Sequence, residues 1–402
     1  MNKIKNNSIF MLYAIIIGAV TGLIVWIFLK VMNIGINFLW NTLPNIVDIP
    51  FYTIIVCTIG GLIIGIWKKI NGDYPENLEE VMEKVKKDGR YSYDKLGVVS
   101  ISAMLPLIFG GSIGPEAGLS GVIAGLCTWV GDKLKYFFKE MKELTQIGVS
   151  ATLSTIFNSP MFGFVAPIES EEQTILPKKS KIIVYFLAIF GAFGIIILLN
   201  NIFNSKMGMP SFDGLIITSR EWLWLLPLII IGIVSGYFYL YSNKLITKVS
   251  NPIQKYPILI CILSGLILGI AGTILPYTMF SGEHQMEEIM HSFKDVGIII
   301  LIVTAFIKLF ITNTCIIMGF KGGHFFPCIF SGVSLGYAFS MLLGTNSTFS
   351  VIIITTTLIS FIMNKPFATI LLLMIIFPPS AIPVMVLSAV LGSSIRTLKN
   401  DN

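Results

Sequence analysis

Two short glycine-rich stretches decide the fold of this chain: Gly110-Gly-Ser-Ile-Gly-Pro115 and Gly322-Gly-His-Phe-Phe-Pro327. They share the frame G-G-x-x-x-P, they lie 322 − 110 = 212 residues apart, and Ser-Gly-Val follows each of them. Glycine permits backbone angles that other residues avoid, and proline is well suited to the first turn of a helix. Each stretch therefore predicts a helix that begins within an apolar part of the chain.

Two further pairs of motifs recur in the same order. Leu78-Glu-Glu-Val-Met82 returns as Met286-Glu-Glu-Ile-Met290, and Asn158-Ser-Pro160 returns as Asn364-Lys-Pro366, with offsets of 286 − 78 = 208 and 364 − 158 = 206. Three ordered pairs at nearly one offset predict an internal duplication. Duplicated halves of membrane proteins often pack as inverted repeats, with substrate sites where helices are interrupted. The apolar residues of 78–85 also recur at helical spacing, which predicts a short amphipathic helix.

The composition is that of a membrane protein. Of the 402 residues, 54% are hydrophobic and 12% are charged, whereas soluble proteins carry about 25% charged residues. This excludes a soluble enzyme. The 28 basic and 22 acidic residues give a mild net charge of +6, and they are scattered between apolar runs, which excludes a nucleic-acid partner. The five cysteines lie in apolar segments without a C-x-x-C pair, so we expect neither disulfides nor a metal site.

Long uncharged stretches predict the membrane helices. A bilayer-spanning helix needs about 20 apolar residues, and five stretches of that order occur at 6–29, 49–67, 182–205, 222–243 and 256–282. Several more helices must share the C-terminal third, with breaks at glycine and proline. No strand periodicity appears, so the sequence predicts an all-α polytopic membrane protein. We expect one integral membrane domain made of an N-terminal helix (1–50), a first half-repeat (51–205), a connecting helix (206–255) and a second half-repeat (256–402).

The positions of the lysines predict the orientation. Lys3 and Lys5 precede the first expected span, and Lys68 and Lys69 follow the second. Cytoplasmic loops of membrane proteins carry an excess of lysine and arginine. We therefore expect a cytoplasmic N-terminus in a bacterial-type plasma (inner) membrane.

A helix that begins inside the membrane is a site for an anion. Its first N–H groups have no acceptor in the helix, and its N-terminus carries about half a positive charge. Backbone groups bind a small anion without trapping it, as conduction requires. The alternative is that the two stretches are only tight turns or helix-packing contacts.

At these residues the sequence resembles the CLC family of chloride channels and chloride/proton antiporters, from the first span to about residue 393. Gly111-Ser-Ile-Gly-Pro115 resembles the family motif G-[K/R]-E-G-P, and Gly323-His-Phe-Phe-Pro327 resembles G-x-F-x-P. Asn71-Gly-Asp-Tyr-Pro75 takes the place of G-S-G-I-P, and Asn158-Ser-Pro160 with Glu169 is similar to N-A-P…E-E. The resemblance implies an inverted-repeat homodimer with one pore per subunit. It implies chloride or a related small anion as the substrate, with no cofactor.

The resemblance and the helix starts together predict the residues of the pore. These are Gly72 near the cytoplasmic mouth, then Gly111, Ser112, Ile113, Gly114, Gly323, His324, Phe325 and Phe326. We expect the anion to be held by the backbone N–H groups of 112–114 and 324–326.

The sequence also departs from the family pattern. Ile113 stands where the family has its gating and proton-accepting glutamate, Gly72 stands where it has a pore serine, and Ser170 stands where exchangers often keep an inner glutamate. A pore-lining tyrosine is not recognisable near the end of the chain. An isoleucine neither competes with chloride nor carries a proton, so we expect passive or weakly coupled conduction. Asp73 is awkward for an anion path, and the sequence gives it no role.

Other ionisable residues have two interpretations each. Glu116 is either a displaced proton carrier, which would make the protein an anion/proton antiporter, or an acidic residue that the helix dipole favours in a first turn. Glu169 is either a vestigial inner proton site or a solvated loop charge. His324 is either a pore donor or a packed polar residue. His284 and His291 are best interpreted as part of a solvated helix face.

One enzyme class remains as a remote alternative. Gly110 to Gly114 matches G-x-S-x-G, the nucleophile motif of serine hydrolases, and His324 could be its base. That motif requires a strand before the serine, which this sequence does not predict. We therefore expect a transport protein and no enzyme.

Overall fold

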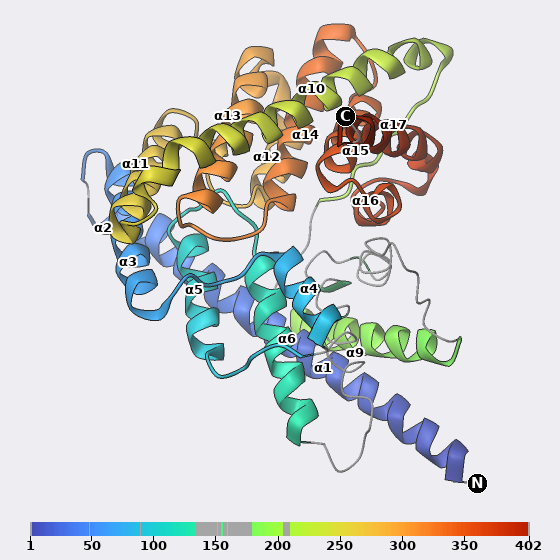
Figure 1. Cartoon of the computed structure of the whole chain (residues 1–402). Coiled ribbons are helices and arrows are strands. Elements are labelled where there is room, and N and C mark those ends of the chain that lie inside the picture. Colours follow the sequence, from blue (N-terminus) through green and yellow to red (C-terminus); the bar gives the residue numbers. More distant parts are fainter. Residues whose placement is uncertain are drawn as a thin grey trace. The chain divides into compact units, whose positions relative to one another are not determined.

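The computed structural model is helical throughout the residues that it describes, which are 2–47, 49–88, 90–133, 151, 154–155, 159, 179–203 and 210–400. Eight of the described helices are long and apolar enough to cross a membrane. All five spans expected from the sequence fall on such helices. The expectation of an all-α polytopic membrane protein is therefore confirmed (Figure 1).

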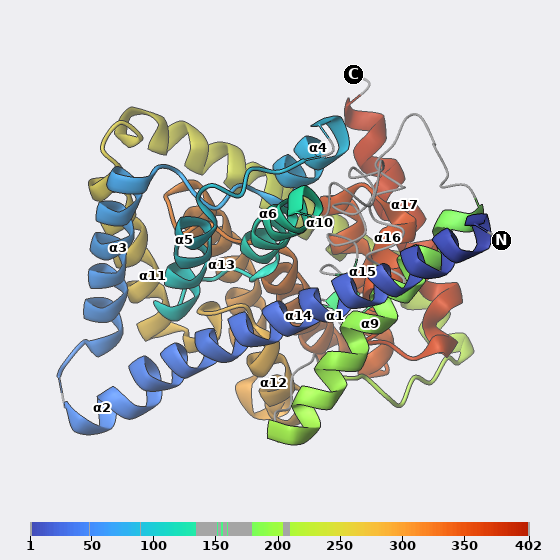
Figure 2. The same cartoon turned by 90° about the horizontal axis from the view of Figure 1, so that it is seen from below.

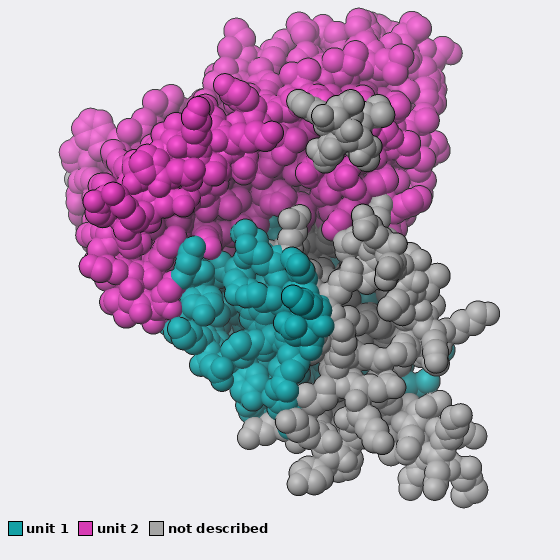
Figure 3. All heavy atoms as spheres, in the orientation of Figure 1, with its two compact units in different colours: residues 1–37, 73–104, 115–208 teal, residues 38–72, 105–114, 209–402 magenta. Residues whose placement is uncertain are grey.

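The chain divides into two compact units, which Figure 3 colours separately. The first comprises residues 1–37, 73–104 and 115–208, and the second comprises residues 38–72, 105–114 and 209–402. Because both units are built from separated segments, the boundary between them does not follow the expected half-repeats. The assignment of the half-repeats stays a prediction.

The described helices of the first unit surround a small apolar core. They are α1 (Asn2–Asn37), α4 (Leu78–Asp88), the first part of α5 (Leu96–Ile108), α6 (Glu116–Lys133) and α9 (Lys179–Phe203). Val81 and Val85 are buried on α4, as the predicted amphipathic helix requires.

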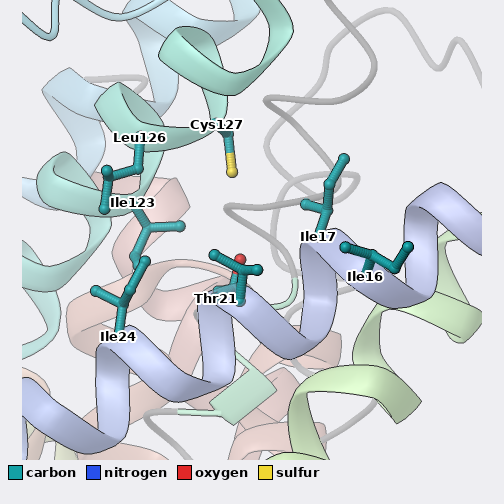
Figure 4. Close-up of a pocket in the computed structure, with 8 residues that line it drawn as sticks. Ile16, Ile17, Thr21, Ile24, Ile123, Leu126 and Cys127 are labelled. Carbon is teal, nitrogen blue, oxygen red and sulfur yellow. The ribbon is translucent and has the colours of Figure 1, made fainter. Parts of the chain in front are cut away.

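A pocket of about 60 Å³ lies between α1 and α6 of this unit. In Figure 4 the side chains of Ile17, Ile24, Ile123 and Cys127 are among those that line it. Because the lining is almost wholly aliphatic, this pocket offers an anion nothing and does not belong to the candidate site.

The second unit contains most of the membrane helices. Its helices are η1 (Phe38–Thr42), α2 (Leu43–Ile46), α3 (Tyr52–Asn71), α10 (Ser219–Ser250), η2 (Asn251–Ile253), α11 (Pro257–Ile274), η3 (Pro276–Thr278), α12 (Glu283–Val296), α13 (Ile298–Ile317), α14 (Phe325–Leu343), α15 (Ser347–Met363), α16 (Pro366–Leu373), η4 (Pro379–Ala381) and α17 (Ile382–Asn400). The stretch 256–282, expected as one span, ends as a membrane helix at Ile274, and a turn follows it.

Glycines set the closest helix contact of this unit. Helices α3 and α11 lie side by side (Figure 2). A Cβ atom on Gly61 would lie 2.2 Å from the carbonyl oxygen of Cys261, and one on Gly265 would lie 2.1 Å from that of Cys57. Small residues let membrane helices approach this closely. All five cysteines are free and buried, as expected for small core residues.

Helices α14 and α15 form the centre of the second unit. Nearly every residue of both helices is buried, which is typical of helices that are apolar on all sides. Gly344 ends α14 and Asn364 ends α15, each in the left-handed conformation. Pro366 then begins α16. The C-terminal third is thus divided at glycine and proline, as predicted, with Asn364 as an additional terminator.

Candidate functional site

Two loops of the second unit pair through their glycines. The N–H group of Gly114 donates to the carbonyl oxygen of Gly323, and that of Gly323 donates to the carbonyl oxygen of Gly114, both at 2.8 Å. Helix α14 begins at Phe325, two residues after Gly323, and α6 begins at Glu116, two residues after Gly114. Both expected helix starts are therefore present, and each follows directly on a paired glycine.

The turns before the paired glycines repeat the same geometry. Gly110 and Gly319 both have positive φ, 80° and 111°. The N–H group of Gly111 donates to Pro106, and that of Phe320 donates to Cys315, both at 2.8 Å. Each structural pair lies at one offset (319 − 110 = 323 − 114 = 209). The duplication predicted from the motifs is thus visible in the backbone of the loops.

This register corrects the one that the sequence suggested. Matching the two G-G-x-x-x-P frames places Gly322 opposite Gly110, whereas the structure places Gly319 there and puts Gly322 opposite Ile113. Proline misleads because several positions at a helix start tolerate it. Pro115 precedes α6, whereas Pro327 is the third residue of α14. The glycine with positive φ is the better marker.

Ile113 closes the first loop. Its side chain is fully buried, and its Cδ1 would lie 2.5 Å from a Cβ atom on Gly322. Its own N–H group donates to the carbonyl oxygen of Gly111 at 2.9 Å. The residue that replaces the gating glutamate of the family thus fills the space that a glycine leaves on the opposite loop.

The backbone N–H groups of the first loop are largely used within the protein. Those of Ile113 and Gly114 donate to Gly111 and Gly323, so in this structure neither points to an anion, in contrast to the prediction. The first intrahelical bonds run from Leu119 to Pro115 and from Cys328 to His324. By helix geometry, the amides that remain for a ligand are those of the first turns, among them Phe325 and Phe326.

Ser112 contacts the helix beneath the loop. It is fully buried, and its Oγ lies 3.1 Å from Oγ1 of Thr312 on α13. Thr312 in turn donates to the carbonyl oxygen of Lys308, one turn earlier. The hydroxyl that a hydrolase would need as a nucleophile is therefore held in a hydrogen bond with a threonine.

His324 occupies the N-cap position of α14, where its side chain makes no cap hydrogen bond. Its ring centroid lies 4.4 Å from that of Phe325 and 5.9 Å from that of Tyr239 on α10. The packing of His324 between aromatic rings agrees with the second of its two interpretations. Tyr239 was not predicted, because nothing in the sequence links α10 to a loop 85 residues later.

The remaining predicted residues lie elsewhere in the chain. Glu116 is the first residue of α6 and is fully buried, so it is no solvated surface charge. Gly72 ends α3 with a φ of 101° and is exposed. Its place at a pore mouth stays a prediction. Glu169 and Ser170 lie outside the described residues. His284 and His291 are exposed on α12, as interpreted.

Sequence reasoning missed Lys308. Its side chain is fully buried in the middle of α13, and its Nζ donates to three backbone carbonyl groups. The signal was present, because Lys308 is the single charged residue between Gly297 and Phe320. An ionisable residue within a membrane span is a functional hypothesis by default.

Comparison with known proteins identifies the family. The family model described as "Voltage gated chloride channel" matches residues 59–397. The "Putative ion-transport protein YfeO" of Escherichia coli O17:K52:H18 is 25% identical over 333 residues, which are 80% of this chain and 77% of that protein. Its counterpart in Salmonella typhimurium LT2 is 24% identical over 338 residues, with 80% and 78% covered.

Solved structures share the fold. A CLC-type fluoride/proton antiporter superposes with a TM-score of 0.76 at 20% identity, covering 97% of this chain and 95% of its own. A slow cyanobacterial Cl⁻/H⁺ antiporter gives a TM-score of 0.77 at 18% identity, with 96% and 93% covered. At this identity the likeness establishes the fold alone. Because the family model covers most of the chain, this protein belongs to the voltage gated chloride channel family, the CLC family, whose members carry chloride and related small anions across membranes.

Proposed function

We propose that this protein conducts chloride or a related small inorganic anion passively, with little or no coupling to protons. The observation that supports it best is the pairing of Gly114 with Gly323. This pairing fixes a loop directly before α14, a helix that is buried along most of its length and whose N-terminal dipole favours an anion. Backbone groups distinguish anions from cations without binding them tightly.

The side chain of Ile113 supports passive conduction. In a coupled exchanger a carboxylate at this position would exchange a proton and compete with the anion. A buried aliphatic side chain does neither. The passage of an anion then requires only that the loop open or the side chain move, and no proton has to accompany it.

Glu116 supports a second candidate, an anion/proton antiporter. It is a fully buried carboxylic acid at a helix start, and acidic residues within membrane proteins often carry protons. The family includes exchangers with this fold, so the same backbone serves both modes.

One experiment separates the two candidates. The purified protein is reconstituted into liposomes, and chloride efflux and external pH are recorded together, with and without a potassium ionophore. Passive conduction predicts chloride efflux without proton movement, and efflux that Glu116→Gln changes by less than about twofold. Exchange predicts proton uptake that follows chloride and is lost in Glu116→Gln. Glu287→Gln, at an exposed acidic residue of α12, is the matched control. Absence of anion flux in the wild type would contradict both candidates.

We also propose the setting in which the protein acts. Lys3 and Lys5 support a cytoplasmic N-terminus in a bacterial inner membrane, and family membership supports a homodimer with one pore per subunit. The transported anion is the sole ion required, and no cofactor or enzymatic activity is expected. Ser112 follows a helix, whereas a hydrolase nucleophile follows a strand. Cross-linking in membranes and labelling of a cysteine introduced at Asn2 test the dimer and the orientation.

A further inference from the structure

Lys308 is a cation in the membrane-spanning part of the protein. It lies in the middle of α13, and its side chain has no exposed surface. Its Nζ donates to the carbonyl oxygens of Tyr277 and Met279 at 2.9 Å and of Phe280 at 3.1 Å. An ammonium group has three N–H donors, whereas a neutral amine has two and a lone pair that would face an oxygen. The three acceptors therefore match the charged form.

The hydrogen bonds of Lys308 are satisfied, but its charge is not neutralised. In the part of the chain that the structure describes, its partners are carbonyl groups and the ring of Phe330, 4.7 Å from Nζ. None of these carries a negative charge. Removing a charge from water is costly unless an opposite charge is nearby. An anion in the adjacent pathway would supply that charge.

The position of Lys308 links it to the paired loops. On the same face of α13, one turn later, Thr312 contacts Ser112. The segment that holds the ammonium also contacts the first loop, because the N–H group of Phe280 donates to the carbonyl oxygen of Gly110 at 3.1 Å. Phe330 lies in the second turn of α14. The ammonium is therefore surrounded by the elements that position both loops and the start of α14.

We propose that Lys308 sets the affinity of the pathway for anions by placing an uncompensated positive charge behind the paired loops. This inference rests on the proposed anion transport and adds to it the source of the electrostatic attraction. Helix dipoles supply partial charges, whereas Lys308 supplies a full charge that water does not screen. Because a buried charge acts at a distance, it strengthens binding without contacting the anion. It also attracts small anions alike, whatever their radius.

The test compares neutral and charged replacements of Lys308. Lys308→Met removes the charge and keeps the length, Lys308→Gln keeps two N–H donors, and Lys308→Arg keeps the charge. The control is Lys294→Met, which removes an exposed lysine that also lies near a ring, 5.9 Å from that of Phe293. For each variant the half-saturating concentrations of chloride and of fluoride are measured from flux into liposomes, and folding is checked by size-exclusion elution and helix content.

We expect both neutral variants to raise the half-saturating concentration about tenfold, by the same factor for both anions. Lys308→Arg should stay within about threefold of the wild type, and Lys294→Met should not change. Folded neutral variants with wild-type affinity would overturn the inference. So would neutral variants that fail to fold while Lys308→Arg folds, because the role of Lys308 would then be structural. A wild type without flux would instead contradict the proposed function.

Discussion

The loops before α6 and α14 have the same backbone but different side chains. Both turn at a glycine with positive φ, both bond back five residues, and both pair through a glycine two residues before a helix. At equivalent positions, however, Ile113 faces Gly322, Pro115 corresponds to His324, and Glu116 corresponds to Phe325. The backbone, which is suited to an anion, has kept its symmetry, and the side chains that modify transport have not.

The difference extends to the helices beneath the loops. Lys308 on α13 corresponds, at the same offset of 209, to Val99 on α5 (308 − 99), and both are buried. One half thus provides a buried acid at its helix start, and the other provides a buried cation beneath its loop. This asymmetry teaches that the two halves share one recognition geometry but contribute different charges to it.

The largest effect is expected from exchanging Ile113 and Gly322. Ile113→Gly removes a fully buried side chain, and Gly322→Ile forces a Cβ atom to within 2.5 Å of Ile113. Each change should lower the free energy of unfolding by about 2–4 kcal/mol and reduce anion flux at least about tenfold. The double variant returns one isoleucine to the same space and should recover more than about 1 kcal/mol. Additive losses, measured by thermal unfolding in detergent, would show that the two loops do not share this space.

A smaller effect is expected at the turn glycines. Gly110→Ala and Gly319→Ala both place a side chain at positive φ, which should cost about 1–3 kcal/mol each. Gly319→Ala should cost more, because its Cβ atom would lie 2.3 Å from Sγ of Cys261. Gly97→Ala on α5 is the matched control, since open space surrounds that position, and it should gain up to about 1 kcal/mol. Equal melting temperatures for all three would contradict the shared turn geometry.

The smallest effect is expected at Glu283, in the helix that precedes the second loop. This half-buried residue begins α12, and desolvation raises the pKa of its carboxyl group from 4.5 to about 7. A raised pKa in the folded state means that the protein loses stability as the pH rises from about 4.5 to 7. Glu283→Gln should remove that loss and raise stability at pH 8 by roughly 1 kcal/mol. At pH 4 the two proteins should melt alike, and a gain at pH 4 would contradict the titration.

The sequence by itself determined the helical membrane fold, the family and the two helix starts. These follow from local chemistry: the low content of charged residues, apolar runs of bilayer length, and glycines where the chain must turn. Lys308 could also have been found, since a lone lysine in an apolar span is visible without a structure.

The tertiary structure alone decided how these pieces meet. It set the register of the repeat at 209 and showed that the N–H groups of Ile113 and Gly114 are engaged within the protein. It also brought Tyr239 to His324 and three carbonyl groups to Lys308. Such contacts join residues far apart in the chain, and side chains of many kinds satisfy them. They leave no periodic trace in the sequence, because they depend on packing in three dimensions.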